Sequence, residues 1–434
     1  MATRGLRTSA VCLPLAILAG VAGVATICQR TCAQSPNELR KILENNAPSA
    51  AELQALDNYF NNFFKKFKQP KSGDELPKSR KDYGNIVRGI PATTAHKHLN
   101  TLVLTELRTI LMGRYPRVVK YNAMLMIADL NESDETRSPK PSPDAFKILL
   151  QALNAPAEWD YLKPAALVGL ARFAEDGGIP KDRTAQVSET LLALVNEKNP
   201  QAGRNASTHN FLRRSAARAL AAMHSTGPGN NVVKAFEDIA ADSKARPTLR
   251  CEIARYIGAL TYPPEAKVDL QRLANILGHQ TVEICRQELD RSKDKGDASR
   301  RLVLYVLDSS NEGLQKLSNS ADGDAKKFIY DLKKKVETLF QDLDNTEKTP
   351  DGDVASLVQT EITNIEGTLL PKPEPEPLVP APRESRRSRP VPISDAAPAV
   401  AVRNTEVPPR PNHISLSNRQ KDLPHGRVSR MGRG

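Results

Sequence analysis

The sequence predicts an all-α fold in which paired helices repeat along the chain. Aromatic residues make up only 5% of it, with Trp159 as its one tryptophan, whereas a β-sandwich needs regular β-branched and aromatic strands. An alanine-rich amphipathic segment, Leu212 to Met223 (LRRSAARALAAM), also recurs in altered form at three other places. The related segments are VKYNAMLMIADL from Val119 to Leu130, LKPAALVGLARF from Leu162 to Phe173, and LRCEIARYIGAL from Leu249 to Leu260.

The four segments share one register of apolar residues. Positions 1, 5, 9 and 12 of each segment are apolar, and these positions fall on one face of a 3.6-residue helix. The segments begin at residues 119, 162, 212 and 249, close to the spacing of ~40 to 47 residues that is typical of helical-hairpin repeats. The register therefore predicts a helical repeat array in which each segment is the second helix of a pair.

Residues 1–33 have the pattern of an export signal peptide. Arg4 and Arg7 supply a positive start, Leu13 to Ile27 is an apolar core, and Thr31 to Ala33 offers a cleavage site. The alternative, an uncleaved anchor, has an apolar stretch shorter than the ~20 residues of a comfortable membrane span. No second run of that kind follows, so we expect an exported chain, periplasmic or extracellular, that is not transmembrane once mature.

Residues 34–93 are expected to form an N-terminal helical cap and a connection. Ser49 to Glu52 matches a capping box, and it opens a helix with five aromatic residues between Tyr59 and Phe67. We expect these rings to cover the end of the repeat core, as the terminal caps of repeat arrays do. The alternative is a docking surface, which requires the rings to be exposed.

Residues 94–289 are expected to hold the repeats. Four first helices are predicted to pair with the four recurrent segments: Thr94 to Met112, Phe146 to Leu153, Val187 to Val195, and Val232 to Ile239. Val268 to Leu277 and Val282 to Leu289 are predicted to form a further pair that follows the pattern less closely.

Residues 290–434 are predicted to form three parts. Residues 290–343 are expected to form C-terminal helices, and residues 344–370 a linker in which Val354 to Leu370 makes one or two helical turns. Residues 371–434 are rich in proline and arginine and poor in branched or aromatic residues. Such a segment cannot bury enough apolar surface to offset its ordering entropy, so a disordered tail is predicted.

The recurrent segments resemble the second helices of HEAT repeats, which form the armadillo-type superhelix. The resemblance covers about Thr94 to Leu289 and includes Pro116 and Pro247, which stand where that family often has a proline before the second helix. It implies a HEAT-like α-solenoid that acts as a scaffold through an extended concave surface. An exported chain with such a body and a Pro/Arg-rich tail is similar in kind to uncharacterised bacterial envelope proteins.

A row of basic residues occupies the second position of the four segments: Lys120, Lys163, Arg213 and Arg250. On the concave surface that the resemblance implies, this row is the candidate partner-binding site, suited to an acidic peptide or polysaccharide. The alternative is that each side chain lies along its apolar neighbour and bonds within its own or the next repeat.

The net charge of +12 does not indicate a nucleic-acid-binding body. It divides into +3 from the signal, +6 from residues 371–434 and +3 from residues 34–370. A body so nearly balanced lacks the basic footprint that binding to DNA or RNA requires. We expect the tail to be a solubilising or spacing segment; the alternatives are a proline-rich ligand for a partner domain and a cationic contact with anionic envelope polymers or lipid headgroups.

No catalytic, cofactor or metal pattern stands out. His96 and His98 lie about 200° apart on a helix, so they cannot share a metal from one face. The acidic turns at Gly323 and Gly352 lack the acidic ligand order of an EF-hand, and no nucleophile elbow, phosphate loop or haem motif occurs. Cys251 and Cys285, the two cysteines beyond the signal, are expected as buried thiols, with a disulfide as the alternative.

The sequence therefore favours a non-catalytic protein-interaction scaffold of the bacterial periplasm or cell envelope. One alternative is an envelope-anchoring protein that acts through its tail. The other is an enzyme of the HEAT-like lyase type, whose residues would converge from separate helices.

Overall fold

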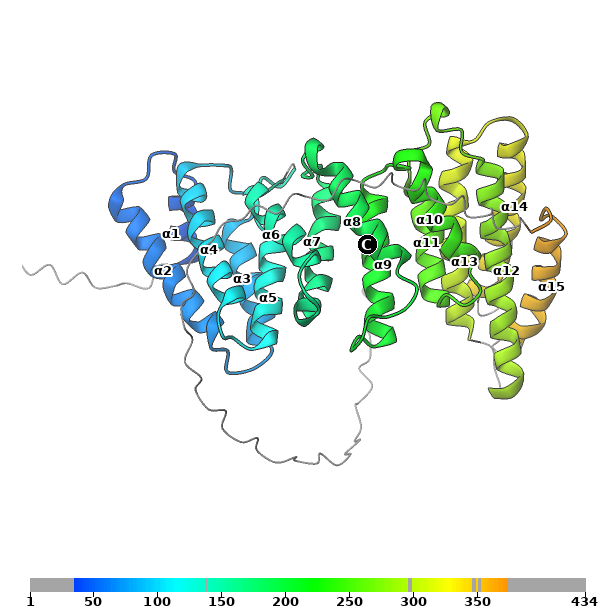
Figure 1. The fold of residues 1–434 in the computed structure, drawn as a ribbon, viewed down its shortest axis with the longest axis horizontal. Coiled ribbons are helices and arrows are strands. Elements are labelled where there is room, and N and C mark those ends of the chain that lie inside the picture. Colours follow the sequence, from blue (N-terminus) through cyan, green and yellow to red (C-terminus); the bar gives the residue numbers. More distant parts are fainter. Residues whose placement is uncertain (1–34, 138, 296–298, 346–348, 350–352, 373–434) are drawn as a thin grey trace, which may run out of the picture. The chain divides into compact units, whose positions relative to one another are not determined.

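The structure consists almost entirely of α-helices. It is a computed structural model that describes residues 35–372 apart from residues 138, 296–298, 346–348 and 350–352, and these residues belong to one unit, Met1–Pro375. Within the described ranges the chain forms fifteen α-helices and one two-stranded antiparallel sheet (Figure 1). The all-α prediction is confirmed. The predicted signal, and all but the first two residues of the predicted tail, lie outside the described residues.

Three helices precede the repeats: α1 (Pro36–Leu43), α2 (Ala50–Lys68) and α3 (Glu75–Val87). Ser49 caps α2 through the predicted capping box, since its hydroxyl accepts from the Glu52 amide and its own amide donates to the Glu52 carboxylate at 2.7 Å. Phe60, Phe64 and Phe67 on α2 are fully buried. These rings belong to the core, which supports the interpretation of α2 as a cap over the interpretation of an exposed docking surface.

Four helical pairs follow, each with a first helix and a second helix. The first helices are α4 (Thr94–Met112), α6 (Pro143–Leu153), α8 (Thr184–Asn196) and α10 (Asn231–Ala241). The second helices are α5 (Arg117–Ala128), α7 (Lys163–Glu175), α9 (Ala206–Ala222) and α11 (Pro247–Ala259). The two members of a pair pack on each other, and each second helix also packs on the next one (Figure 1). The second helices thus form a continuous layer, which is compatible with a helical solenoid.

The apolar register of the four segments forms the core between the layers. Every residue at positions 1, 5, 9 and 12 is buried except Met223, which is half-buried. Together with apolar side chains of the first helices they belong to one cluster that runs from Leu39 to Ile365. Removal of this apolar surface from water is the main stabilising contribution to such a fold.

Short elements connect the helices. They are the strands β1 (Asn131–Ser133) and β2 (Lys140–Pro141) and the short 3₁₀-helices η1 (Ala157–Leu162), η2 (Lys181–Arg183), η3 (Pro228–Asn230) and η4 (Pro264–Ala266). Arg172 on α7 fastens the first of these connections, because its guanidinium donates to the carbonyls of Ala128 and Leu130 and to the Asn131 side chain. The end of one second helix is thereby tied to the next.

The fifth predicted pair is a single helix, α12 (Leu270–Lys295), so the break expected between Leu277 and Val282 is wrong. Gly278 occupies this position, and a Cβ built on it would lie 2.4 Å from a methyl carbon of Leu369 and 3.1 Å from one of Leu332. The glycine therefore makes room for neighbouring segments and does not end the helix. A glycine that serves packing looks the same in the sequence as a glycine that marks a turn.

Three helices complete the described unit: α13 (Arg300–Ser320), α14 (Gly323–Asp344) and α15 (Val354–Glu366). The last of these lies in the segment expected as a linker, and it is longer than the one or two turns predicted there. Val354, Val358, Ile362 and Ile365 are buried, and α15 packs on α12 and α14. The spacing of these four residues gives α15 one apolar face, and that face is covered by the core.

The residues after α15 lie along α12. The Leu370 amide donates to Asn275 Oδ1 at 2.9 Å, and the Asn275 amide group donates to the Leu370 carbonyl at 3.3 Å. His279 Nε2 lies 2.8 Å from the same carbonyl oxygen. The chain is therefore fastened to α12 immediately before the proline-rich segment begins.

Candidate functional site

The predicted basic row lies beside the buried register. Because a helix turns about 100° per residue, the second position of a segment is only about 60° around the helix from the buried fifth position. Lys163 is 5% exposed, Arg213 is 6% exposed and Arg250 is 1% exposed. Three of the four side chains are therefore almost completely removed from solvent.

Two arginines of this row perform the same task in consecutive repeats. Arg213 Nε donates to the Val195 carbonyl, in the last turn of α8, at 2.9 Å. Arg250 Nε donates to the Ala240 carbonyl, in the last turn of α10, at 3.0 Å. Carbonyls in the last turn of a helix have no amide partner within the helix, and a cation there also interacts favourably with the helix dipole. Each arginine therefore caps the first helix of its own pair.

The other two members of the row also have partners within the chain. Lys163 Nζ lies 3.0 Å from Asp160 Oδ1, and Lys120 Nζ lies 5.1 Å from the ring centroid of Trp159. The structure thus places all four candidate partner-binding residues against groups of their own or the neighbouring repeat. This corresponds to the alternative interpretation of the row, and we assign it no role in partner binding.

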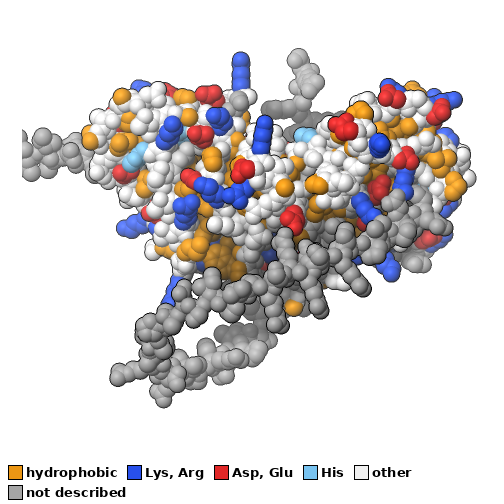
Figure 2. All heavy atoms as spheres, turned by 45° about the horizontal axis from the view of Figure 1, so that its top comes forward, with side chains coloured by type: hydrophobic (Ala, Val, Ile, Leu, Met, Phe, Trp, Pro, Cys, Tyr) orange, Lys and Arg blue, Asp and Glu red, His pale blue; other side chains and the backbone are white. Residues whose placement is uncertain are grey.

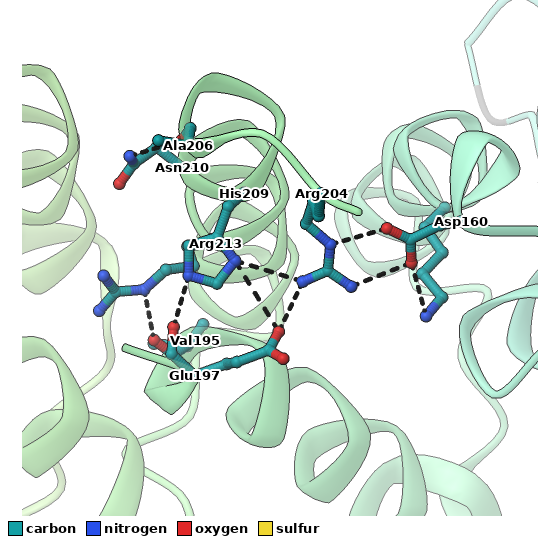
Figure 3. Close-up of polar contacts among 9 residues, drawn as sticks. Asp160, Val195, Glu197, Arg204, Ala206, His209, Asn210 and Arg213 are labelled. Atoms are coloured by element: carbon teal, nitrogen blue, oxygen red, sulfur yellow. Dashed lines mark hydrogen bonds and ion pairs between the residues drawn. The ribbon is translucent and has the colours of Figure 1, made fainter. Parts of the chain in front are cut away.

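A buried ionic network connects two neighbouring repeats (Figure 3). Arg204, in the connection from α8 to α9, donates to both carboxylate oxygens of Asp160 at 2.7 and 3.0 Å, and to Glu197 Oε2 at 2.7 Å. The Arg204 side chain is 2% exposed, so these contacts form away from water. The network ties η1 and the start of α7 to the end of α8 and to the connection that follows it.

His209 on α9 completes the network and has a defined tautomer. Its Nδ1 atom lies 3.2 Å from an Arg204 guanidinium nitrogen, which can only donate, so Nδ1 accepts. The proton is therefore on Nε2, which donates to the Glu197 carbonyl oxygen at 2.8 Å (Figure 3). Both ring nitrogens are used, so the ring holds the end of α8 in place.

The ionisation of this network suits fastening and not proton transfer. Burial raises the pKa of Asp160, but hydrogen bonds from Arg204 and Lys163 outweigh that effect and hold the pKa below its ordinary value. The hydrogen bond to Asp160 in turn raises the pKa of Arg204. Both groups remain ionised at neutral pH, whereas a general acid or base is most effective with a pKa near the working pH.

A second network joins α11 to α13. Arg255 on α11 forms ion pairs with Glu252 at 3.4 Å, with Glu312 at 3.2 Å and with Asp308, and it lies over the ring of Tyr305. The Tyr305 hydroxyl donates to Glu252, and burial together with that carboxylate raises the pKa of the phenol. The cation is thus surrounded by carboxylates of its own chain.

The second helices present a different surface on the side opposite the register. If the residue before each segment is position 0, positions 0, 3 and 7 lie on that side of the helix. We call these nine residues of the first three segments the outward face: Val118, Tyr121 and Leu125 on α5, Tyr161, Pro164 and Val168 on η1 and α7, and Phe211, Arg214 and Arg218 on α9.

The outward face exposes large apolar side chains in neighbouring helices. Val118 is 50% exposed, Val168 is 45% exposed and Phe211 is 37% exposed. Helix α7 packs on both α5 and α9, so these side chains lie on three adjacent helices of one layer. On the side of the molecule drawn in Figure 2, apolar side chains lie among charged side chains of both signs.

Two arginines of this region are stacked on aromatic rings. The guanidinium carbon of Arg117 lies 5.3 Å from the Tyr161 ring centroid, and that of Arg214 lies 5.5 Å from the Phe211 ring centroid. Neither arginine forms an ion pair with a carboxylate in the described part of the chain. By contrast, Arg218 is paired with Glu175 at 3.0 Å.

The described residues contain no cluster of three or more His, Cys, Asp or Glu side chains able to hold a metal ion. In the same ranges no helix combines the length and apolar character needed to cross a membrane. Cys251 and Cys285 are free, buried thiols, and burial raises the pKa of each to about 12.

Sequence reasoning did not single out Arg204, Glu197 or Phe211. Arg204 and its partner Asp160 are 44 residues apart in the chain, and no local pattern links them. Phe211 was detectable in principle, because it precedes the recurrent segment by one residue and therefore lies opposite the apolar register.

Comparison with protein-family models, with curated proteins and with solved structures gave no match.

Proposed function

We propose that this chain is a non-catalytic protein-interaction scaffold, a HEAT-like solenoid of the armadillo type that acts in the bacterial periplasm or cell envelope. The observation that carries the proposal is the outward face, where Val118, Val168 and Phe211 are exposed on three second helices that pack side by side. Exposed apolar side chains that form one surface are typical of protein-binding sites.

The polar clusters also support the proposal, because their charged groups are paired with one another. Arg204, Asp160, Glu197 and His209 are held by one another, and Arg255 is held by three carboxylates. Titratable groups used in this way stabilise the stacking of repeats. A rigid array with an accessible side is what a scaffold requires, because a preorganised surface loses little conformational entropy on binding.

Reciprocal co-purification tests the scaffold function. The mature protein, residues 34–434, is tagged and purified from the envelope fraction of its own cells, with and without residues 371–434, and the proteins recovered are tagged in turn. We expect at least one stoichiometric partner that recovers this chain in the reverse experiment and does not need the tail. Recovery of no reciprocal partner would contradict the scaffold function, and a partner lost with the tail would favour tail-mediated anchoring.

A reporter fusion tests the location separately. Alkaline phosphatase, which is active only after export because it requires disulfides, is fused after residue 370. We expect activity that disappears when residues 1–33 are deleted. An inactive fusion that is made in full would contradict export.

A further inference from the structure

We propose that the outward face binds a short extended segment of a partner protein that carries acidic residues next to apolar ones. This inference rests on the proposed scaffold function and names the partner chemistry of the same surface. It follows from three features of the described residues: the apolar side chains exposed there, the cations beside them, and the way the surface changes at the next repeat.

The apolar requirement comes from the exposed side chains. Val118 and Phe211 occupy position 0 of their segments, whereas Val168 occupies position 7, about 10 Å farther along its helix at a rise of 1.5 Å per residue. A segment that contacts all three side chains must therefore run along the helix axis as well as across α5, α7 and α9. Three neighbouring helices span about 20 Å at an interaxial distance of roughly 10 Å. With the displacement along the axis included, the path is about 29 Å, and an extended chain that rises roughly 3.3 Å per residue covers it with about nine residues.

The acidic requirement comes from the cations beside these side chains. Arg117 and Arg214 are each stacked on a ring and have no carboxylate partner among the described residues. The contact with the ring holds a guanidinium in place while its N–H groups stay available in the guanidinium plane. A carboxylate that approaches in that plane can accept two parallel hydrogen bonds, which selects aspartate or glutamate over other side chains.

The outward face ends at α11, the second helix of the fourth pair. On α11 the corresponding positions are Thr248, the buried Cys251, and Arg255, which is already surrounded by Glu252, Asp308 and Glu312. An acidic segment would meet like charge there. Arg255 has three carboxylate partners, whereas Arg117 and Arg214 have none among the described residues. The proposed site is therefore confined to α5, α7 and α9.

A protein segment fits this surface better than a nucleic acid. Arginine and aromatic side chains can bind both, but bases stack on open ring faces, and here one face of Tyr161 and of Phe211 is covered by a guanidinium. The exposed aliphatic side chains of Val118 and Val168 offer a base nothing to stack on. The body between residues 34 and 370 also has a net charge of only +3.

Peptide display on the mature full chain tests the inference. A library of random twelve-residue peptides is selected on the protein, and enriched sequences are synthesised with a fluorophore for anisotropy measurements. We expect enrichment of sequences with Asp or Glu beside Leu, Ile, Val or Phe, and we expect their affinity to fall with added salt. Enrichment of no sequence, or of basic sequences, would overturn the inference.

Surface variants locate the binding. The double variant Val168→Ser/Phe211→Ser should weaken the selected peptides about tenfold or more, and Arg117→Gln/Arg214→Gln should weaken them and remove the salt dependence. Tyr330→Ser is the matched control, because Tyr330 is 56% exposed on α14 and lies far along the chain from this face. All the substituted side chains are partly or largely exposed, and circular dichroism with a melting curve verifies that each variant is folded.

The outcomes separate this inference from the scaffold function. If a reciprocal partner is found and its complex survives Val168→Ser/Phe211→Ser unchanged, the scaffold function stands and the outward face is not its site. A labelled single-stranded oligonucleotide is measured in parallel. Binding of that oligonucleotide at the peptide affinity, lost in the same variants, would also overturn the proposal.

Discussion

Arg250 offers the sharpest test of how the repeats hold together. Its side chain is 1% exposed, caps α10 through the Ala240 carbonyl at 3.0 Å, and lies 3.0 Å from the Glu283 carboxylate on α12. The substitution Arg250→Met keeps an apolar stem of similar length and removes the guanidinium. The Ala240 carbonyl is then buried without a side-chain donor, and Glu283 keeps only the longer contact with Lys372 at 3.9 Å.

The expected loss of unfolding free energy is about 3 kcal/mol. A hydrogen bond to a charged group contributes roughly 1.5–3 kcal/mol, and breaking a buried ion pair costs roughly 3–5 kcal/mol. The cost falls near the lower end of that range because the Glu283 side chain is 27% exposed and can be rehydrated. The methionine stem also retains part of the packing of the original side chain.

Urea denaturation followed by circular dichroism measures this loss, with Arg286→Met as the matched control. The Arg286 side chain is 51% exposed and pairs with Glu366 at the surface, so the same substitution there should cost less than about 1 kcal/mol. Equal effects of the two substitutions, or a loss below about 1 kcal/mol for Arg250→Met, would refute the capping role.

Three further predictions concern packing, pH and the thiols. Gly313→Ala should destabilise the protein by about 1–3 kcal/mol or more, because its Cβ would lie 2.3 Å from a backbone oxygen of α11. Gly84→Ala, which meets nothing within 4 Å, should stabilise it by up to about 1 kcal/mol, and a destabilising result there would contradict the argument. Asp160→Asn should lower stability at pH 7. Since the folded-state pKa of Asp160 is below its ordinary value of 3.8, the ionised carboxylate stabilises the fold above that value, and the difference from the parent should vanish as the pH falls through the folded-state pKa. Cys251 and Cys285 should resist a bulky thiol reagent at pH 8 in the mature folded chain and give two reactive thiols in urea; rapid labelling without urea would contradict their burial.

The core of this protein could be derived from the sequence because it depends on local periodicity. Ala216 and Leu220 are buried for the same reason that Ala166 and Leu170 are, since each pair occupies the fifth and ninth positions of a recurrent segment. A helix must cover its apolar side whatever packs against it. The same argument identified the cap at Ser49, because a capping box involves residues only three apart.

The candidate site was harder to predict because it depends on which residues meet across repeats. The sequence showed the basic row, but it did not show in which direction the four side chains point. A position about 60° from the buried register can be buried or exposed, depending on what packs beside it. Here Arg213 and Arg250 are buried because the carbonyls of Val195 and Ala240 lie beside them and accept their hydrogen bonds. Arg204 was not part of any recurrent pattern, and one of its two carboxylate partners, Asp160, belongs to the preceding repeat.

The sequence alone determined the helical class of this chain, the buried side of its second helices and the approximate place of each pair, since these follow from side-chain spacing within one helix. The tertiary structure decided that Gly278 lies within a continuous helix, that the four basic residues contact groups of their own chain, and that Val118, Val168 and Phe211 stay exposed. Those outcomes depend on distances between segments tens of residues apart, and such distances are set by the packing of whole helices and not by any local pattern.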